Sequence, residues 1–402
     1  MRPLDGIRVI EVSSWMATPS AGAILADLGA EVVKVEPLTG DPMRGLARQP
    51  RHPDPDRPNV DEPFQVDNRG KRSMALDLGH DEAKSVMRRL VADADVFVCN
   101  LLPHRQGRFG VTAEELLAVN HRLVHATLTG YGTVGPEAWR PGFDVTAFFG
   151  RGAVSDGLSE PDGPPPTPRP AQGDHTTGLA LVAGILAALR AAERTGQGQV
   201  IETSLLHASA WTLATELAPT LIDHRQPSRR DRRHQISPLN NRFQCADEKW
   251  LVLTMPEPRW WVPFCKGIGR PEWADDPRYS SGRARYENGP ELTDELDAMF
   301  ATKDRDEWGR ILDDGGLIWG PIQTQVELVE DPQARAAGLW TEIQHPEAGP
   351  FETVHIPVRM HGVDLSPRTP APALGQHTDA VLAEAGFEPE EITALRDAGV
   401  VG

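Results

Sequence analysis

The sequence of 402 residues predicts an α/β fold in two domains, a larger one built on a mainly parallel sheet and a smaller α+β one. The length exceeds the size at which a single hydrophobic core usually stops growing. From residue 7 to about 205, short β-branched runs alternate with helix-period segments, which is the pattern of βαβ units. An arginine-dense polar stretch, 222–239, then predicts a linker, and the hairpin pattern that follows it opens a small domain over 240–325.

The first βαβ unit carries clear boundary signals. Thr18 stands at an N-cap position, Pro19 at the first helical position and Gly29 just past the end, so we expect a helix over 19–28. The flanking β-branched runs predict strands over 7–14 and 31–36.

The later elements of the large domain follow from the same two periodicities. A helix over 81–93 would place Ala83, Val86, Met87, Leu90 and Val91 on one apolar face. Thr112 and Glu115 have the spacing of a capping box at the start of another helix. Further strands are expected over 95–100, 123–132, 339–344 and 350–360, and a strand running into a helix over 199–217. We also expect a hairpin over 242–255, a final helix over 390–401 and a proline-rich loop over 48–63.

Composition excludes several functional classes. The formal charge of −17 makes nucleic acid or an anionic membrane surface an unfavourable general partner. Cys99, Cys245 and Cys265 show neither metal-ligand spacing nor a disulfide framework, which suits a reducing cytoplasm. The N-terminus lacks a signal-peptide pattern, and the most apolar stretch, 178–189, is too short and alanine-rich to span a bilayer. We therefore expect a cytoplasmic protein.

Two familiar kinds of site are disfavoured. Glu36 ends the second strand where NAD enzymes place an acidic residue, but the preceding turn has no G-x-G-x-x-G, and Trp15 and Met16 stand where a pyrophosphate would approach. We interpret Glu36 as a solvated strand end. The histidines are scattered without metal-binding spacing, so no metal is assigned. Cys99 and Cys265 are interpreted as small core residues.

Asp174 opens the longest apolar segment, which closes on Gly196 and Gly198. An aspartate at a helix start accepts amide hydrogen bonds and feels the helix dipole, and both favour its ionised form. Such a carboxylate can serve as a cap, or as a nucleophile toward an activated acyl group. The local pattern leaves both roles open.

A set of motifs in fixed order resembles the class III CoA-transferases over essentially the whole chain. These are "PLDGIRVIEVSSWMATPSAGAILADLGAEVVKVEPLTGDPMR", "NRGKRSMALDL", "DVFVCNLLPHRQGRFGV", "GYGTVGPEAWRPGFD", "GDHTTG" with "TGQGQ", "DPQARAAGLW" and "PALGQHT". The resemblance implies that Asp174 is the nucleophile, forming an aspartyl anhydride and then an aspartyl-CoA thioester, with no ATP or metal. It implies acyl-CoA and carboxylic acid substrates, whose identity the sequence does not give.

The same resemblance implies where coenzyme A binds. The expected contacts lie on the turn after the first strand, on the loop after "NRGKRS", at the ends of the next strands and on a phosphate-side arginine. They are Met16, Ala17, Leu76, Asp77, Leu78, Gly79, Asn100, Arg108, Gly130 and Tyr131.

Relatives of the family supply the main alternative function. The α-methylacyl-CoA racemases resemble this chain but carry a proton-transferring histidine where Phe143 stands, and Phe143 cannot take a proton. Transferase is therefore favoured over racemase or isomerase, with His175 as a conceivable substitute base. A nucleotide-binding dehydrogenase or a non-catalytic acyl-CoA binder is a distant alternative. The stretch "SPLNNRFQCADEKW" lacks the glycine-rich loop of formyl-CoA transferases and is similar to relatives that handle larger 2-hydroxy, aryl or steroid-type acyl groups.

The resemblance also implies an overall architecture. Class III enzymes are interlocked homodimers with a Rossmann-like large domain built from both ends of the chain. By this likeness, residues 1–221 form the N-terminal part of the large, CoA-binding domain, and 326–402 form a C-terminal linker and return to it.

Overall fold

The computed structural model of the chain describes residues 1–46, 60–229 and 231–402. The chain forms two compact units, a larger one of Met1–Asp156, Thr167–Arg225 and Ala337–Gly402 and a smaller one of Gly157–Pro166 and Gln226–Ala336. Residues 226–239, at the end of the predicted linker segment, therefore belong to the smaller unit. Most of the predicted proline-rich loop, 48–59, lies outside the described residues.

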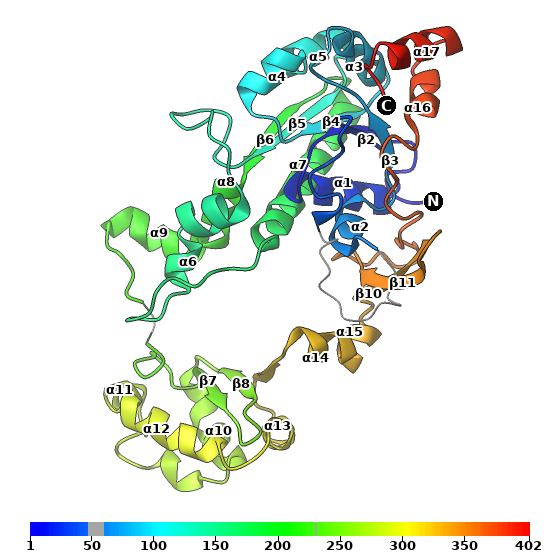
Figure 1. Ribbon diagram of the computed structural model, residues 1–402. Coiled ribbons are helices and arrows are strands. Elements are labelled where there is room, and N and C mark those ends of the chain that lie inside the picture. The colour runs from blue at the N-terminus through cyan, green and yellow to red at the C-terminus, as the bar shows by residue number, and fades with distance from the viewer. Residues whose placement is uncertain (47–59, 230) are drawn as a thin grey trace. The chain divides into compact units, whose positions relative to one another are not determined.

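A six-stranded parallel sheet forms the centre of the larger unit, in the order β3-β2-β1-β4-β5-β6 (Figure 1). The order runs outward in both directions from β1 and β4, so the topology reverses between these two neighbours. A crevice at the carboxyl ends of the strands is expected at this reversal. The strands are β1 (Arg8–Val12), β2 (Glu31–Glu36), β3 (Arg72–Ala75), β4 (Val96–Cys99), β5 (Val124–Thr129) and β6 (Val200–Ser204).

Helices cover both faces of this sheet, as a fully buried parallel sheet requires (Figure 1). Successive strand residues alternate between two cores: Val9 packs on the side of α1, α7 and α8, and Ile10 packs on the side of α3, α5, α16 and α17. The helices of this unit are α1 (Ala17–Asp27), α2 (Glu62–Asn68), α3 (Ala83–Ala92), α4 (Pro103–Phe109), α5 (Ala113–Val119), α6 (Val154–Gly157, which ends in the smaller unit), α7 (Gln172–Thr195), α8 (Leu205–Thr212), α9 (Ala214–Asp223), α16 (Thr378–Glu384) and α17 (Pro389–Asp397), with a π-helix η2 (Val145–Arg151).

Several local predictions are confirmed. The five apolar residues expected on one face of α3 are all buried, and Thr112 and Glu115 form a complete capping box on α5. Gly29 follows α1 with a positive φ of 114°. The predicted N-cap is wrong, because α1 begins at Ala17 and Thr18 lies inside the helix, fully buried.

The smaller unit is built around the predicted hairpin. Strands β7 (Asn240–Gln244), β8 (Trp250–Thr254) and β9 (Trp319–Ile322) form an antiparallel sheet in that order, over a core that includes Phe243 and Trp308. Its helices are η3 (Pro258–Trp260), α10 (Trp261–Gly267), η4 (Pro271–Ala274), α11 (Gly282–Glu287), α12 (Gly289–Phe300), α13 (Arg305–Asp314), α14 (Gln325–Glu330) and α15 (Pro332–Ala336). In the larger unit the predicted C-terminal strands form a hairpin, β10 (Trp340–His345) and β11 (Gly349–Val354).

Helix α7 ends at Thr195, before Gly196 as the sequence predicted, and it is longer than its most apolar stretch, 178–189. By length and composition alone its 24 residues could cross a membrane, a test that the core helix of a soluble protein also passes. Here Leu181, Val182 and Ile185 pack in the core beside α1. The two helices approach closely because Gly178 has no side chain: a Cβ there would lie 2.8 Å from the Ala17 carbonyl oxygen.

A network of buried charges joins β1, β2 and the segment before β3. Glu11 forms ion pairs with Lys34 at 3.2 Å and with Lys71 at 2.8 Å, and Lys34 also pairs with Asp41 at 2.9 Å. These four side chains are buried, and burial lowers the pKa of Lys71 to about 8 despite the charge of Glu11. Removing one member of such a network leaves a partner charged, desolvated and uncompensated, which is strongly destabilising.

Glu36 is not the solvated strand end that the sequence predicted. It is buried and accepts two hydrogen bonds from the Arg44 guanidinium, at 2.8 and 2.7 Å, and one from Ser73 Oγ at 2.7 Å. Burial opposes ionisation, yet these hydrogen bonds and the charge of Lys34 leave the pKa of Glu36 below its usual value. Arg44 and Ser73 lie 8 and 37 residues further along the chain, so the pattern around Glu36 does not reveal these contacts.

The network predicts an asymmetry between two helical glycines. A Cβ at Gly22 would overlap Glu11 Oε2 and lie 3.0 Å from Lys71 Nζ, whereas one at Gly107 in α4 would meet nothing within 4 Å. We expect Gly22→Ala to lower the free energy of unfolding by about 2–4 kcal/mol, because it displaces buried charges. Gly107→Ala should be neutral or stabilising by about 0.5–1 kcal/mol. Denaturant unfolding of both variants checks this, and equal effects would contradict it.

Candidate active site

A cavity of about 540 Å³ lies at the carboxyl ends of the parallel strands. Its lining comes from the turn after β1, the segment after β3, the end of β4 and the end of β5, together with the start of α7. It therefore occupies the crevice expected where the strand order reverses. Among the described residues, Asp174 and Asp77 contribute the two carboxyl groups of this lining.

The turn after β1 is held in a strained conformation. Trp15 has a φ of 70°, in the left-handed region that side chains other than glycine seldom adopt. Asn100 fixes the preceding residue, accepting from the Ser14 N–H at 3.3 Å and donating to the Ser14 carbonyl at 2.7 Å. The Trp15 N–H donates to Asp41 at 3.1 Å. Since Asp41 pairs with Lys34, the buried charge network reaches the wall of the cavity.

Asp174 is the third residue of α7 and makes no capping hydrogen bond. The helix begins two residues before it, after Ala171 with its positive φ of 80°. Asp174 therefore does not take the capping role, one of the two roles that the local pattern left open. Because the cap position lies elsewhere, the Asp174 carboxyl group is left to line the cavity.

The surroundings of Asp174 oppose its ionisation. Burial, followed by the charges of Asp144 and Asp67, raises the pKa of this carboxyl to about 7, while His175 acts in the opposite direction. The expectation that the helix start alone keeps Asp174 ionised is thus wrong. Burial, together with two carboxyl groups brought in from other elements, has the larger effect on the pKa.

Asp144 belongs to the segment before the π-helix η2. It is buried and accepts a hydrogen bond from the Val145 N–H at 2.7 Å. Burial raises its pKa, and the backbone N–H groups of Val145, Ala171 and Gly173 partly counter this, although its Oδ2 has no hydrogen-bond partner among the described residues. This carboxyl, and not Asp174, is the one that faces the backbone N–H groups at the start of α7.

His175 contacts a residue from a different helix. Its Nε2 lies 3.1 Å from Oδ1 of Asp67, a buried residue of α2. This hydrogen bond is the main reason that the pKa of His175 is raised, against the effect of burial. His175 is absent from the cavity lining, whereas Phe143 belongs to it and meets the Trp15 ring edge to face at 5.1 Å.

The predicted coenzyme A contacts divide into two groups. Ala17, Leu76, Asp77, Leu78, Gly79, Asn100 and Gly130 line the cavity. Met16, Arg108 and Tyr131 do not: Met16 packs beside Met43 and Phe64, Tyr131 packs against the core, and Arg108 is exposed. Arg105, three residues before Arg108 on α4, lines the cavity instead.

Sequence reasoning missed Asp67, Asp144 and Arg105. Asp144 ends the quoted motif "GYGTVGPEAWRPGFD", and Asp67 directly precedes "NRGKRS", so both stood beside recognised signals. Neither has a spacing that relates it to Asp174, because they lie 30 and 107 residues away in the chain. Only the fold brings them together.

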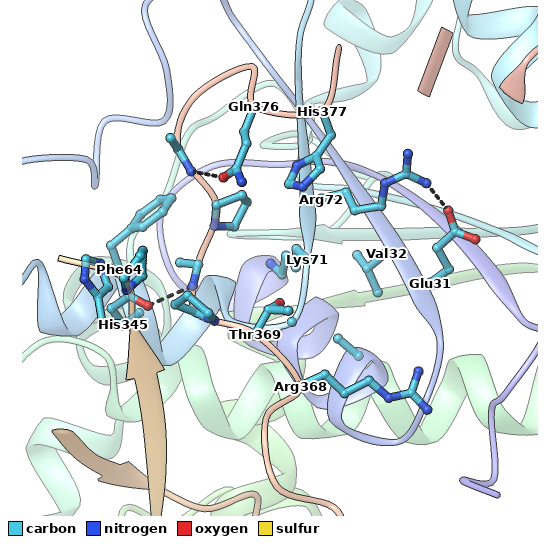
Figure 2. A pocket seen from close by; sticks show the side chains of 18 of the residues that line it. Glu31, Val32, Phe64, Lys71, Arg72, His345, Arg368, Thr369, Gln376 and His377 are labelled. Carbon is cyan, nitrogen blue, oxygen red and sulfur yellow. Dashed lines mark hydrogen bonds and ion pairs between the residues drawn. The ribbon is translucent and has the colours of Figure 1, made fainter. Parts of the chain in front are cut away.

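A larger cavity of about 1260 Å³ lies elsewhere on the same unit (Figure 2). Its lining includes the amino ends of β2 and β3 and residues of the C-terminal segment 344–377. Its arginines are already neutralised: Arg72 pairs with Glu31 at 2.5 Å, as Figure 2 shows, Arg368 with Asp5 at 2.5 Å and Arg44 with Glu36 at 2.7 Å. Asp174 does not line it, so we place the chemistry in the smaller cavity.

Known proteins resemble the chain over nearly its full length. It matches CoA-transferase family III over residues 4–378. The (R)-2-hydroxy-4-methylpentanoate CoA-transferase of Clostridioides difficile is 31% identical over 399 residues, which cover 99% of either chain. The cinnamoyl-CoA:phenyllactate CoA-transferase of Clostridium sporogenes is 32% identical over 97% of this chain and 95% of its own. The crystal structure of Rv3272 from M. tuberculosis has a TM-score of 0.83 at 30% identity, covering 95% of this chain and 99% of that one.

The raised pKa of Asp174 predicts how stability depends on pH. A carboxyl with a pKa of about 7 in the folded protein and a lower one in the unfolded chain takes up protons on folding between these values. Stability contributed by this group is therefore present at low pH and lost as pH rises toward 7. At pH 8 we expect the free energy of unfolding of Asp174→Asn to be about 1–3 kcal/mol higher than that of the natural protein.

Denaturant unfolding at pH 4.5 and pH 8 measures this difference. The advantage of Asp174→Asn should shrink toward zero at the lower pH, because the natural carboxyl is then largely protonated. An exposed aspartate on the same unit, replaced as Asp93→Asn, serves as the matched control. A difference that does not change with pH would contradict the raised pKa.

Proposed function

The chain belongs to CoA-transferase family III and transfers CoA between an acyl-CoA and a carboxylate, and we propose that Asp174 is the nucleophile of this transfer. The observation that carries the proposal is the contrast between the two carboxyl groups of the cavity. Asp77 is exposed and its Oδ1 accepts the Gly79 N–H at 2.8 Å, which fixes a turn. Asp174 is half-buried, makes no capping bond to the described start of α7 and has a pKa near neutrality, as groups with a chemical task often do.

The proposed reaction begins with attack on the donor thioester. An Asp174 oxygen bonds to the acyl carbonyl carbon, the carbon–sulfur bond breaks, and CoA leaves as a thiolate with a mixed anhydride left on the enzyme. The thiolate then attacks the aspartyl carbonyl, which releases the donor acid as a carboxylate and leaves an aspartyl-CoA thioester.

The second half repeats these steps in reverse with the acceptor acid. Its carboxylate attacks the aspartyl thioester and releases CoA thiolate, and the thiolate takes the new acyl group from the anhydride. Asp174 returns as a carboxylate, and no proton is consumed or released over the cycle. The site must therefore tolerate successive anions.

We place CoA along the carboxyl ends of the strands. The segment Leu76–Gly79 after β3, Asn100 after β4 and Gly130 after β5 all line the cavity and offer the nucleotide a wall at the carboxyl ends of these strands. Arg105 on α4 is the cation in the described cavity lining that suits a phosphate, and Arg108 lies one helical turn further along. These arginines would supply positive charge locally, which the net charge of −17 does not.

For the acyl groups we propose branched or aromatic side chains. The rings of Trp15 and Phe143 form an edge-to-face pair in the same cavity as Asp174, together with Leu102 and Leu205. Apolar contact with such a wall stabilises a bulky bound acyl group, whereas the small, charged oxalate and succinate gain little from it. The two relatives named above act on 2-hydroxy-4-methylpentanoate and phenyllactate, both of which carry such side chains.

Trapping the covalent intermediate tests this mechanism. We incubate the full-length protein with formyl-, succinyl-, cinnamoyl- and 4-methylpentanoyl-CoA, add hydroxylamine and digest the product for mass spectrometry. An aspartyl hydroxamate at Asp174 is expected, with the largest yield from the two bulky acyl groups. Asp174→Ala should lose transfer by roughly 10³-fold or more, because no other group replaces the nucleophile.

The matched control and the opposing outcomes separate the parts of the proposal. Asp93→Asn should label at Asp174 like the natural protein. Transfer retained by Asp174→Ala, with no label at residue 174 in the natural protein, would falsify the nucleophile assignment. Preferential labelling by formyl- or succinyl-CoA would leave the nucleophile in place and overturn the proposed acyl class.

We also propose that the protein is a homodimer with interlocked chains, in a reducing cytoplasm. Helices α8 and α9 leave large apolar side chains exposed on the single chain: Trp211 at 81%, Leu221 at 74% and Ile222 at 83%. No residue of α9 is buried, although the helix is apolar along one side. Such a surface supports burial against a second copy. The three cysteines are separate buried thiols, which supports a reducing compartment.

Subunit exchange distinguishes an interlocked dimer from a simple one. We expect sedimentation at twice the chain mass of 44.0 kDa. Tagged and untagged dimers, mixed under native conditions, should not form hybrids over days, because interlocked chains separate only after unfolding. Hybrids should appear after joint unfolding and refolding. Rapid native exchange would contradict interlocking, and a monomer would contradict the dimer itself.

A further inference from the structure

We propose that Asp67 and His175 act as a positioning pair that places a positive charge beside Asp174 and keeps this nucleophile ionised as anions enter the site. The inference rests on the proposed role of Asp174 and goes beyond it, because neither member of the pair lines the cavity. His175 follows Asp174 in α7, and its Nε2 is 3.1 Å from Asp67 Oδ1. The pair thus connects the nucleophile-bearing helix to α2.

Asp67 is held firmly enough to orient the imidazole. It is 3% exposed, and neighbouring residues of α2 are fixed by contacts outside the helix. The Asn68 Oδ1 accepts from Lys71 Nζ at 3.1 Å, and Gln65 Oε1 accepts from the Ala371 N–H at 2.8 Å. His175 is more open, with 45% of its side chain exposed, and its hydrogen bond to Asp67 outweighs the effect of partial burial on its pKa.

The charges around Asp174 show why a cation is needed there. Among the described residues, the charged groups that act on its carboxyl are Asp144 from the segment before η2, Asp67 from α2 and His175 from α7. The two aspartates raise the pKa of Asp174, and His175 lowers it. Asp67 contributes in a second way, since its hydrogen bond raises the pKa of His175 and so favours the imidazolium.

The transfer reaction gives this imidazolium an electrostatic task. Each step moves a carboxylate or a thiolate as an electron-pair donor, and none moves a proton, so His175 has no proton to deliver. A fixed positive charge favours the ionised nucleophile before attack and the released CoA thiolate after it. The pairing with Asp67 holds that charge in place without occupying the cavity.

The pH profile of transfer tests the pair. In the natural protein, kcat/KM with a bulky acyl-CoA should decrease as the pH falls and Asp174 becomes protonated. We call this part of the profile the acidic limb. In His175→Gln the limb should move up by roughly one pH unit, giving about a fivefold to tenfold loss at pH 6.5 and little loss at pH 8.5. His175→Arg, which keeps a positive charge, should restore the limb to nearly its natural position.

A double variant distinguishes electrostatics from damage to the fold. Removing Asp67 as well takes away an anion that opposes ionisation of Asp174. The acidic limb of Asp67→Asn/His175→Gln should therefore lie at a pH closer to that of the natural protein than the limb of His175→Gln does. A structural role would instead give equal or added losses at every pH. His121→Gln, an exposed histidine before β5, is the matched control and should leave the profile unchanged.

The outcomes are separable from those of the nucleophile assignment. An acidic limb unmoved in His175→Gln, with hydroxylamine still labelling Asp174, would overturn the pair and leave the proposed function standing. Absence of any label at Asp174 in the natural protein would instead remove the proposed function, and the pair with it. A limb that moves in His175→Gln and is not restored in His175→Arg would show a shape requirement and contradict the charge role.

Discussion

The ion pairs of Glu11 with Lys34 and Lys71 are the constraint on which the rest of the larger unit depends. They lie among fully buried side chains, so each charge requires its partner. Through Lys34 the network holds Asp41, and Asp41 accepts the Trp15 N–H that keeps the first turn in its left-handed conformation. Gly22 makes the arrangement sterically possible because any Cβ there would overlap Glu11.

The same physical problem recurs at the site, with a different outcome. In the network, opposite charges compensate one another. Around Asp174, the charges of two further carboxyls, Asp144 and Asp67, raise its pKa, and His175 acts in the opposite direction. This arrangement leaves the pKa of the Asp174 carboxyl at about 7. Small changes in the surrounding charges can therefore favour or disfavour its ionised form. In the proposed mechanism, Asp174 becomes in turn a carboxylate, an anhydride and a thioester, and such a balance favours these changes.

The close packing of α1 against α7 places these two regions together. Gly178 lets the helices approach at the Ala17 carbonyl, and the start of α7 therefore lies beside the turn that carries Trp15. Phe143 completes the wall by meeting that ring edge to face. Asp174 and the apolar surface thus come from three segments that are far apart in the chain.

The sequence by itself determined the order and type of most elements, because β-branched runs, helical faces, the capping box at Thr112 and Gly29 act within a few residues. With the motifs it also indicated the family, and it named Asp174 and most of the other predicted site residues that line the cavity. Tertiary structure alone decided the burial of Glu36, the start of α7 ahead of Asp174, the choice of Arg105 over Arg108 and the grouping of Asp67, Asp144 and His175. The reason is physical: burial and charge depend on which groups approach in space, and local spacing carries no record of residues that arrive from elsewhere in the chain.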